Sequence, residues 1–445
     1  MIRTMSSRSV RATVIGLALA GLGACSFSDI LEVQNPDELN EDLLQDDGLI
    51  DVLLSSVKGD FDEAFDDPFI WRGSMFTDES LTGINWEQTA RLNQRIVQFD
   101  EGDADLMFTE ISAALQQADS ISGRLRTLLD TPGTDARFAR TLAYAGYSYI
   151  LMADAMCEAT VAVGDVIHQP LALYQFAVDR FNEALTVATA ANDADLVNLA
   201  RVGLTRAHLN LGNMAQVISI ADQVTANFKY EAEYSDQNPS VYNVLQARVT
   251  SANHSLGVHP KFVAGGVFGT QDLSPVMTDP RVQHFARWRL GHNQLTPLYT
   301  LNASLMMSNY NGQTRAAGGT PALIERGSSI AFASQLEALH NRYEALGDDP
   351  ATLAFVNARR AVGNQAPVAL TGQPLIDELR NQRGKDLFLA GYRLGDLRRW
   401  LRGGQDLFPS GQHVNAQWGD YGTATCFPLP LEEYEGNPNI SLPGS

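Results

Sequence analysis

The chain has 445 residues, with 32 Lys and Arg against 52 Asp and Glu, so its formal net charge at pH 7 is −20. Such an acidic balance argues against a nucleic-acid partner, which needs a basic face, and against a polybasic patch that would hold the protein on an anionic membrane. The length allows one large domain or two ordinary ones.

The first 24 residues have the features of an export signal. Three arginines precede an apolar run over residues 12–22, which is too short to span the roughly 30 Å hydrocarbon core as a helix. The run ends in Leu-Gly-Ala-Cys at Cys25, an order typical of a bacterial lipobox. We therefore predict a lipoprotein signal peptide over residues 1–24 and lipidation of Cys25, with an ordinary secretory signal as the alternative.

The residue after the cysteine indicates where the lipoprotein goes. Ser26 stands where an inner-membrane retention signal would often carry Asp, so we predict sorting to the outer membrane. Acyl chains would provide the anchor, since each buried methylene contributes roughly 0.8 kcal/mol. No later segment reaches 18 apolar residues, and no further membrane span is expected.

A helix start is predicted at residues 35–38, Asn-Pro-Asp-Glu, because Asn caps helices and Pro is tolerated at the first helical position. The stretch from Asp66 to Trp86 is different in character. It combines Pro68 and two glycines with several aromatic residues, and it predicts an irregular loop that carries exposed aromatic side chains.

Helix pairs are predicted over about residues 105–230. Gly146-x-x-Tyr149 and Ala177-x-x-x-Phe181-x-x-Ala184 place small residues and aromatics as in the two helices of one tetratricopeptide repeat. Such repeats predict an α-solenoid core rather than any chemistry. The expected helices cover residues 105–129, 137–157, 171–191, 196–211 and 214–224.

An irregular insertion is predicted over about residues 234–321, which are rich in Gly, Pro, Asn, Ser and Thr. A segment this long is more than a connector and is usually functional. Further helices are expected at 328–346, 350–362 and 374–389, within a C-terminal part over about 328–445. No clean linker divides the chain, so residues 25–445 are predicted to form a single domain.

Two cysteines, Cys157 and Cys426, remain after Cys25. In an oxidising compartment such a pair tends to form a disulfide. The alternative is two separately buried thiols.

The segment from Arg383 to Trp400, RGKDLFLAGYRLGDLRRW, resembles the signature Arg-x-x-Glu-Leu-x-x-Glu-Gly-x-Arg-x-x-Asp-Leu-x-Arg-Trp of the SusD/RagB family. Asp386 and Ala390 stand where the family carries Glu. Arg393, Asp396 and Arg398 beside apolar neighbours predict a helix–turn–helix junction pinned by charged hydrogen bonds, not an active site. Weaker matches follow the family's order at residues 31–36, 207–215, 357–359 and 427–439.

This resemblance implies a mostly α, SusD-like fold with tetratricopeptide-type helix pairs and a long loop-rich insertion. It further implies a surface-exposed outer-membrane lipoprotein that binds an oligosaccharide or a peptide and delivers it to a SusC-like TonB-dependent transporter. Flat aromatic faces dock sugar rings and apolar side chains, and irregular segments are where binding groups tend to sit. The candidate ligand-binding residues are Trp71, Trp86, Trp288 and Tyr310, each of which could instead pack under its own loop.

A hydrolase and a repeat scaffold are the alternatives to a binding protein. An exported hydrolase would be recognised by a Gly-x-Ser-x-Gly or His-Glu-x-x-His motif, and the sequence has neither, so we predict no enzyme, no catalytic residue, no metal and no cofactor. The acidic group Asp100, Asp103 and Asp105 is better explained as a solvated helix entry than as a calcium loop. A tetratricopeptide-repeat scaffold lipoprotein for outer-membrane assembly remains the alternative function.

Overall fold

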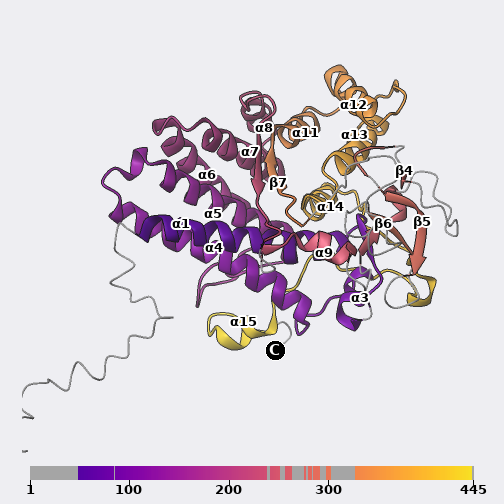
Figure 1. The fold of residues 1–445 in the computed structure, drawn as a ribbon, viewed down its shortest axis with the longest axis horizontal. Helices are drawn as coiled ribbons and strands as arrows, with labels where there is room; N and C mark the ends of the chain where they lie inside the picture. The colour runs from indigo at the N-terminus through magenta and orange to yellow at the C-terminus, as the bar shows by residue number, and fades with distance from the viewer. Residues whose placement is uncertain are drawn as a thin grey trace, which may run out of the picture. The chain divides into compact units, whose positions relative to one another are not determined.

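Helices make up most of the structure, which is a computed structural model (Figure 1). It describes residues 49–84, 86–237, 241–250, 256–262, 275–276, 279–282, 284–290, 297–301 and 326–442. For the strands at 275–276, 284–290 and 297–301 it describes the backbone alone. The predicted signal peptide, the lipidation site Cys25, the helix start at 35–38 and the candidate Tyr310 lie outside the described residues. From Ile50 onward the described residues belong to one compact unit.

A row of long helices forms the first part of this unit. Figure 1 shows the row, in which each helix packs against the next along the chain and α11 closes it against α7 and α8. The helices of this row between residues 102 and 221 confirm those expected over residues 105–230. Their bounds are α1 Ile50–Ala64, α4 Gly102–Leu128, α5 Ala136–Ala155, α6 Pro170–Ala190, α7 Ala194–Leu211, α8 Met214–Ala221 and α11 Gln335–Leu346.

The close approach of α5, α6 and α7 depends on two glycines. A Cβ atom at Gly146 on α5 or at Gly203 on α7 would collide with the ring of Phe181 on α6. Because neither glycine has a side chain, one fully buried phenyl ring fills the space among three helices. Tyr147 Oη then donates a hydrogen bond to the Leu199 carbonyl at 3.0 Å. The predicted pattern of small residues and aromatics therefore does position these helices.

The stretch predicted as an exposed loop, residues 66–86, is instead mostly helical and buried. A π-helical turn η3 (Phe65–Ile70) leads directly into α2 (Trp71–Phe76), followed by β1 (Ser80–Thr82) and α3 (Glu87–Asn93). Phe69, Trp71 and Phe76 are each at most 2 % exposed. The loop prediction was wrong because burying each of these large apolar side chains stabilises the fold by roughly 1.5–3 kcal/mol relative to leaving it exposed.

Two antiparallel sheets accompany the helices. The larger has the strand order β1-β3-β6-β5-β4 and the smaller pairs β2 with β7. Part of the predicted irregular insertion is thus regular, and residues 330–334, predicted as helix, form a strand. The remaining strand bounds are β2 Lys229–Ala232, β3 Leu256–Val258, β4 Pro275–Val276, β5 His284–Leu290, β6 Pro297–Leu301 and β7 Ile330–Ser334, and α9 covers Val244–Thr250.

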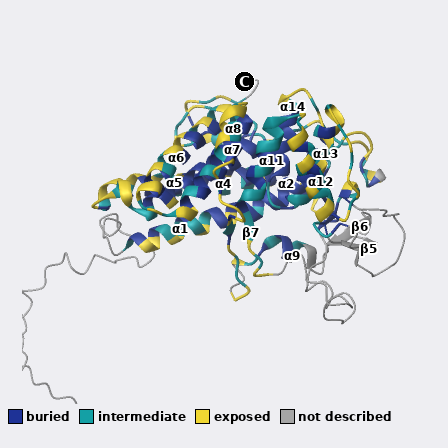
Figure 2. Ribbon diagram, turned by 90° about the horizontal axis from the view of Figure 1, so that it is seen from above, coloured by how far each residue is buried: buried dark blue, intermediate teal, exposed yellow. Residues whose placement is uncertain are grey.

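The C-terminal helices are α12 (Pro350–Val362), α13 (Gln373–Asp386), α14 (Arg393–Arg402) and α15 (Leu431–Gly436). Figure 2 shows buried residues concentrated around α4, α7, α11 and α2, with exposed residues on the outer surfaces. None of the helices in the described ranges is long and apolar enough to cross a membrane.

The segment from Arg383 to Trp400 forms the predicted junction between α13 and α14, and we call it the ion-pair junction. Arg383 Nε donates to Asp396 Oδ2 at 2.6 Å, and Arg399 Nη2 donates to Asp396 Oδ1 at 2.8 Å. Arg398 Nη1 reaches the carbonyl oxygens of Ala153 and Asp154 at the end of α5, both at 2.8 Å. Its arginines thus join the C-terminal helices to the helical row.

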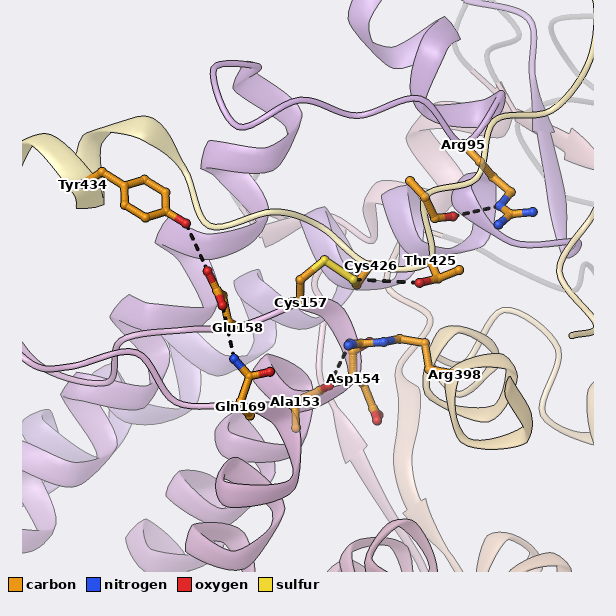
Figure 3. The surroundings of a disulfide bond; sticks show 11 residues. Arg95, Ala153, Asp154, Cys157, Glu158, Gln169, Arg398, Thr425, Cys426 and Tyr434 are labelled. Atoms are coloured by element: carbon orange, nitrogen blue, oxygen red, sulfur yellow. Dashed lines mark hydrogen bonds between the residues drawn. A yellow bond between two sulfur atoms is a disulfide. The ribbon is translucent and has the colours of Figure 1, made fainter. Parts of the chain in front are cut away.

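The C-terminal tail is attached to the same end of α5. Cys157 and Cys426 form a disulfide, one of the two alternatives left open by the sequence (Figure 3). The backbone supports it on both sides, since Cys157 N donates to the Phe427 carbonyl at 2.8 Å and Phe427 N donates to the Ala155 carbonyl at 2.9 Å. The tail therefore crosses the helix end as a paired segment.

Candidate ligand-binding site

The structure places the predicted aromatic residues in unequal environments. Trp71 is fully buried, whereas Trp86, directly before α3, is 52 % exposed. Trp288 lies on β5, and its side chain is outside the described residues, as is Tyr310. Trp86 is therefore the one of the four whose ring is described and accessible to a ligand.

Trp71 and Trp86 are linked by an arginine. The Arg248 guanidinium of α9 lies 3.8 Å from the centroid of the Trp71 ring and 5.7 Å from that of Trp86. Arg72 lies 4.5 Å from the same Trp71 centroid. Cation–π contacts of this kind hold the guanidinium between the rings. The prediction that Trp71 contacts ligand is wrong, because its ring is buried and faces the two arginines. Trp71 instead holds Arg248, which lies next to Trp86.

A cavity of about 800 Å³ opens beside this stack. Its wall is formed by α1, η3, α4 and the segment between β2 and α9. Seven carboxyl side chains line it, and Lys58 is the one cation among the described lining residues. The carboxyl side chains are those of Asp60, Asp62, Glu63, Asp66, Asp67, Glu110 and Glu233. We call this the acidic cavity.

Asp67 belongs both to the acidic cavity and to the aromatic stack. It lines the cavity and forms an ion pair with Arg72, and Arg248 Nη2 lies 3.6 Å from its Oδ2. Arg72 Nε also donates to Asp103 Oδ1 at 2.8 Å, which places Asp103 in this network rather than in a solvated turn. Arg248 and Asp67 thus link the ring of Trp86 to the lining of the cavity.

Several cavity carboxyls bind protons more tightly than usual. Burial raises the pKa of Asp66 to about 8, with a further contribution from the charge of Asp67, although Asp66 Oδ2 accepts a 2.7 Å hydrogen bond from Val244 N. Burial also raises the pKa of Asp62 to about 6, against the opposing effect of Lys58. The pKa of Glu110 is raised by burial and then by neighbouring carboxylates. These carboxyls therefore keep their protons to a higher pH than exposed carboxyls do, because the cavity lining offers them little compensating positive charge.

This arrangement can bind ligands but shows no metal centre. Among the described residues, no three His, Cys, Asp or Glu side chains converge closely enough to hold a metal ion. An exposed indole beside a cavity lined by hydrogen-bond acceptors suits a ligand with a flat apolar face and many donor groups. A sugar chain has both features.

The sequence indicated Trp86 as a candidate, which the structure shows to be exposed, but it did not indicate the acidic cavity. The signal was present in Asp60-Phe61-Asp62-Glu63-Ala64-Phe65-Asp66-Asp67, where five carboxylates alternate with core residues. Their helical spacing could have indicated an acidic face on α1. The opposite wall could not have been found this way, because Glu110 and Glu233 come from distant parts of the chain.

Comparison with known proteins gives the fold a name. No known family model matches the sequence, and no curated protein is similar enough to match. Solved structures do match. A SusD superfamily protein from Bacteroides vulgatus ATCC 8482 is 14 % identical, with a TM-score of 0.61 over 88 % of this chain and 98 % of that chain. A SusD-like carbohydrate-binding protein from the same organism is 14 % identical, with a TM-score of 0.60 over 88 % of this chain and 97 % of that chain.

A third structure, a SusD homolog from Bacteroides thetaiotaomicron VPI-5482, is 12 % identical, with a TM-score of 0.61 over 88 % of this chain and 97 % of that chain. The likeness extends over nearly the whole of each of these proteins. The mostly helical architecture expected from the sequence agrees with it. This chain has the SusD fold.

Proposed function

We propose that this protein is a SusD/RagB-family lipoprotein that binds an oligosaccharide at the outer membrane and delivers it to a SusC-like TonB-dependent transporter. The observation that carries the proposal is the exposed ring of Trp86 beside the acidic cavity on a SusD fold. In this reading the protein captures its ligand and does not transform it. A peptide is the alternative ligand.

Carbohydrate binding is supported by the solved structures of similar fold. Two of them are described as SusD-like carbohydrate-binding proteins and one as a putative sugar-binding protein. The site has the complementary chemistry, because an indole stacks on a sugar face while carboxylates accept hydrogen bonds from its hydroxyls. Hydrogen bonds to a charged acceptor contribute about 1.5–3 kcal/mol each, so a few of them together with stacking give useful affinity.

The predicted lipobox at Cys25 and the family resemblance support delivery to a transporter. A lipid tether keeps captured ligand near the importer, which raises its effective concentration without added affinity. The alternative, a repeat scaffold for outer-membrane assembly, accounts for the helical row but gives no role to the acidic cavity or to Trp86.

The experiment is a binding screen with matched variants. The protein, purified from membranes in mild detergent, is titrated with neutral oligosaccharides and peptides by calorimetry. Trp86→Ala should weaken binding of the recognised ligand roughly 10-fold, judged by nucleobases, for which stacking on an aromatic side chain contributes about 1–3 kcal/mol. Phe99→Ala is the control, because Phe99 is 39 % exposed and does not line the cavity.

The same preparation tests the partner. A large β-barrel protein should co-purify with the wild type. Purification of the protein alone, together with no oligosaccharide binding at any concentration tested, would refute the proposed function.

A further inference from the structure

A second, smaller cavity lies between α13, α14 and the 3-10 turn η6 (Pro260–Phe262), and it shares no described lining residue with the acidic cavity. Its volume is about 190 Å³, below the roughly 300–1,000 Å³ of pockets that enclose drug-sized ligands. It therefore suits a group of about one ring. Three cations line it, Lys261, Arg380 and Arg393, with Asp377 as the one acid among the described lining residues. We call this the cationic pocket.

The absence of a side chain at Gly384 on α13 opens the pocket. A Cβ atom at this position would lie 3.4 Å from the ring of Phe262 and 3.5 Å from Arg393 Nη1, so both border the free space. Arg393 is 5 % exposed. Its Nε and Nη2 donate to Asp78 at 2.5 and 2.7 Å, whereas Nη1 takes part in none of the hydrogen bonds among the described residues. A buried guanidinium thus has donor hydrogens left at the pocket.

Arg380 is the cation of the pocket with the weakest partners. Its Nη1 donates to the neutral side-chain oxygen of Gln405, and it forms an ion pair of 3.5 Å with Asp377. Because Asp377 is exposed, water weakens this ion pair. Arg380 Nε has no hydrogen-bond partner among the described residues. Arg380 therefore lacks the two-pronged carboxylate contact that Arg393 makes with Asp78.

The carboxylates of the chain do not balance this positive charge. Lys261 and Arg393 share Asp78, so the three cations have Asp78 and Asp377 as their ion-pair partners. Burial lowers the pKa of Lys261 by more than Asp78 raises it, and burial also lowers the pKa of Arg380 against the effect of nearby carboxylates. One further negative charge in the pocket would stabilise these cations.

The walls indicate what kind of group carries that charge. Phe262 and Leu407 provide apolar surface, and the exposed side chain of Asn381 provides an amide at the α13 edge. The C–H face of a sugar ring packs on apolar walls, and its hydroxyls bond to an amide. Guanidinium groups pair best with planar carboxylates. A sugar ring that bears a carboxylate matches all of these features.

We propose that the cationic pocket binds a uronic acid unit of an acidic oligosaccharide, with Arg380 as a direct donor to the carboxylate and Arg393 Nη1 at the base of the pocket. This inference rests on the proposed function, and it names a class of sugar that the protein accepts. Because no described residue lines both cavities, the cationic pocket can be tested separately from the acidic cavity.

The test compares two sugars that differ in one group. Glucuronate and glucose, with a carboxylate in place of a hydroxymethyl group, are titrated into the purified full chain at low salt, and binding is followed by NMR of the ligand. We expect glucuronate to bind roughly 10-fold tighter or more, the factor that a charge-assisted hydrogen bond supplies. The preference should decrease with added salt, because the pocket is partly open to solvent.

Variants then locate the effect. Arg380→Gln should reduce the affinity for glucuronate to that for glucose. Gly384→Ala should remove most of the glucuronate binding, because its Cβ occupies the base of the pocket; it fits at van der Waals distance inside a helix, so this variant folds. The matched controls are Arg342→Gln on α11, which lies outside the pocket lining, and Gly123→Ala on α4, whose Cβ meets nothing within 4 Å.

Each outcome decides. Equal affinity for glucuronate and glucose, a preference that persists in both Arg380→Gln and Gly384→Ala, or acetate that binds as tightly as glucuronate overturns the uronic acid proposal. The proposed function survives any of these results if Trp86→Ala still weakens oligosaccharide binding. It fails separately if no oligosaccharide, acidic or neutral, binds.

Discussion

Buried carboxylates occur in two regions of the molecule, and the two regions differ in how their charge is balanced. In the ion-pair junction Asp396 pairs with Arg383 and Arg399 at hydrogen-bond distance, and Arg399 also pairs with Glu344 of α11. In the acidic cavity, Asp62 and Asp66 lie among other carboxylates with Lys58 as the nearby cation. Burial acts on both sets in the same direction, so the difference lies in the partners.

The pKa values reflect this difference. Burial alone would raise the pKa of Asp396, but Arg383 and Arg399 outweigh it and lower the pKa to about 2. At the cavity burial prevails and raises the pKa of Asp66 to about 8. Glu79 is an exception beside the junction, since burial raises its pKa to about 8 although Leu389 N donates to it at 3.0 Å. The junction carboxylates stay charged and hold helices together through arginines, whereas the cavity carboxyls lack such partners and retain their protons.

The largest expected effect comes from breaking the balance in the junction. Asp396→Ala leaves Arg383 and Arg399 without their shared acceptor in a buried position. Removing one partner of a buried ion pair typically costs about 3–5 kcal/mol. Urea unfolding should show a decrease of this size in the free energy of unfolding. A decrease below about 1 kcal/mol would mean that the junction does not hold the helices together.

Loss of the disulfide should have the next largest effect. The Cys157–Cys426 bond closes a loop of 269 residues beside the carbonyls that Arg398 contacts. Replacing both cysteines by Ser should lower the free energy of unfolding by roughly 2–4 kcal/mol, through the larger entropy of the unfolded chain. Mass spectrometry of unreduced peptides provides the check on the wild type, and free thiols at both positions in exported protein would contradict the pairing.

At the acidic cavity a comparable substitution should have the opposite sign. Because the folded-state pKa of Asp66 is raised, the folded protein holds a proton that the unfolded chain has lost, and stability falls as the pH rises from about 4 to about 8. Asp66→Asn removes this dependence and should raise the free energy of unfolding on the order of 1–3 kcal/mol at about pH 8.5 relative to wild type, with little change near pH 4.

A matched control sharpens the comparison. Asp396→Asn removes a carboxylate whose folded pKa is lowered to about 2, so its stabilising contribution is present above about pH 4 and is lost as the pH falls towards 2. The two Asn variants should therefore change the pH profile of stability in opposite directions. Profiles of the same sign would show that the cavity carboxylates are as well compensated as those of the junction.

Local patterns predicted much of the fold. The helices from α4 to α8 were expected from periodicity and small residues, and the junction from the charged signature between Arg383 and Trp400. The failures are also physical. Residues 66–76 contain Pro and Gly, but their aromatic side chains make them core, and Phe332 and its neighbours form β7 because a strand pairs with β2 across about 100 residues. Such long-range pairing leaves no local signal.

The candidate site was predicted only in part for the same reason. Trp86 was identified as an exposed aromatic, whereas Trp71 was assigned to the ligand although it supports Arg248 from within the core. The acidic cavity depends on Glu110 and Glu233 lying opposite α1. Their convergence is a property of the packed helices and not of any motif.

A crystal structure of the full chain with a bound oligosaccharide tests the central claim most directly. The account predicts a sugar ring stacked on Trp86, with the rest of the ligand against the acidic cavity. An oligosaccharide bound on a surface that includes neither Trp86 nor the acidic cavity would contradict it.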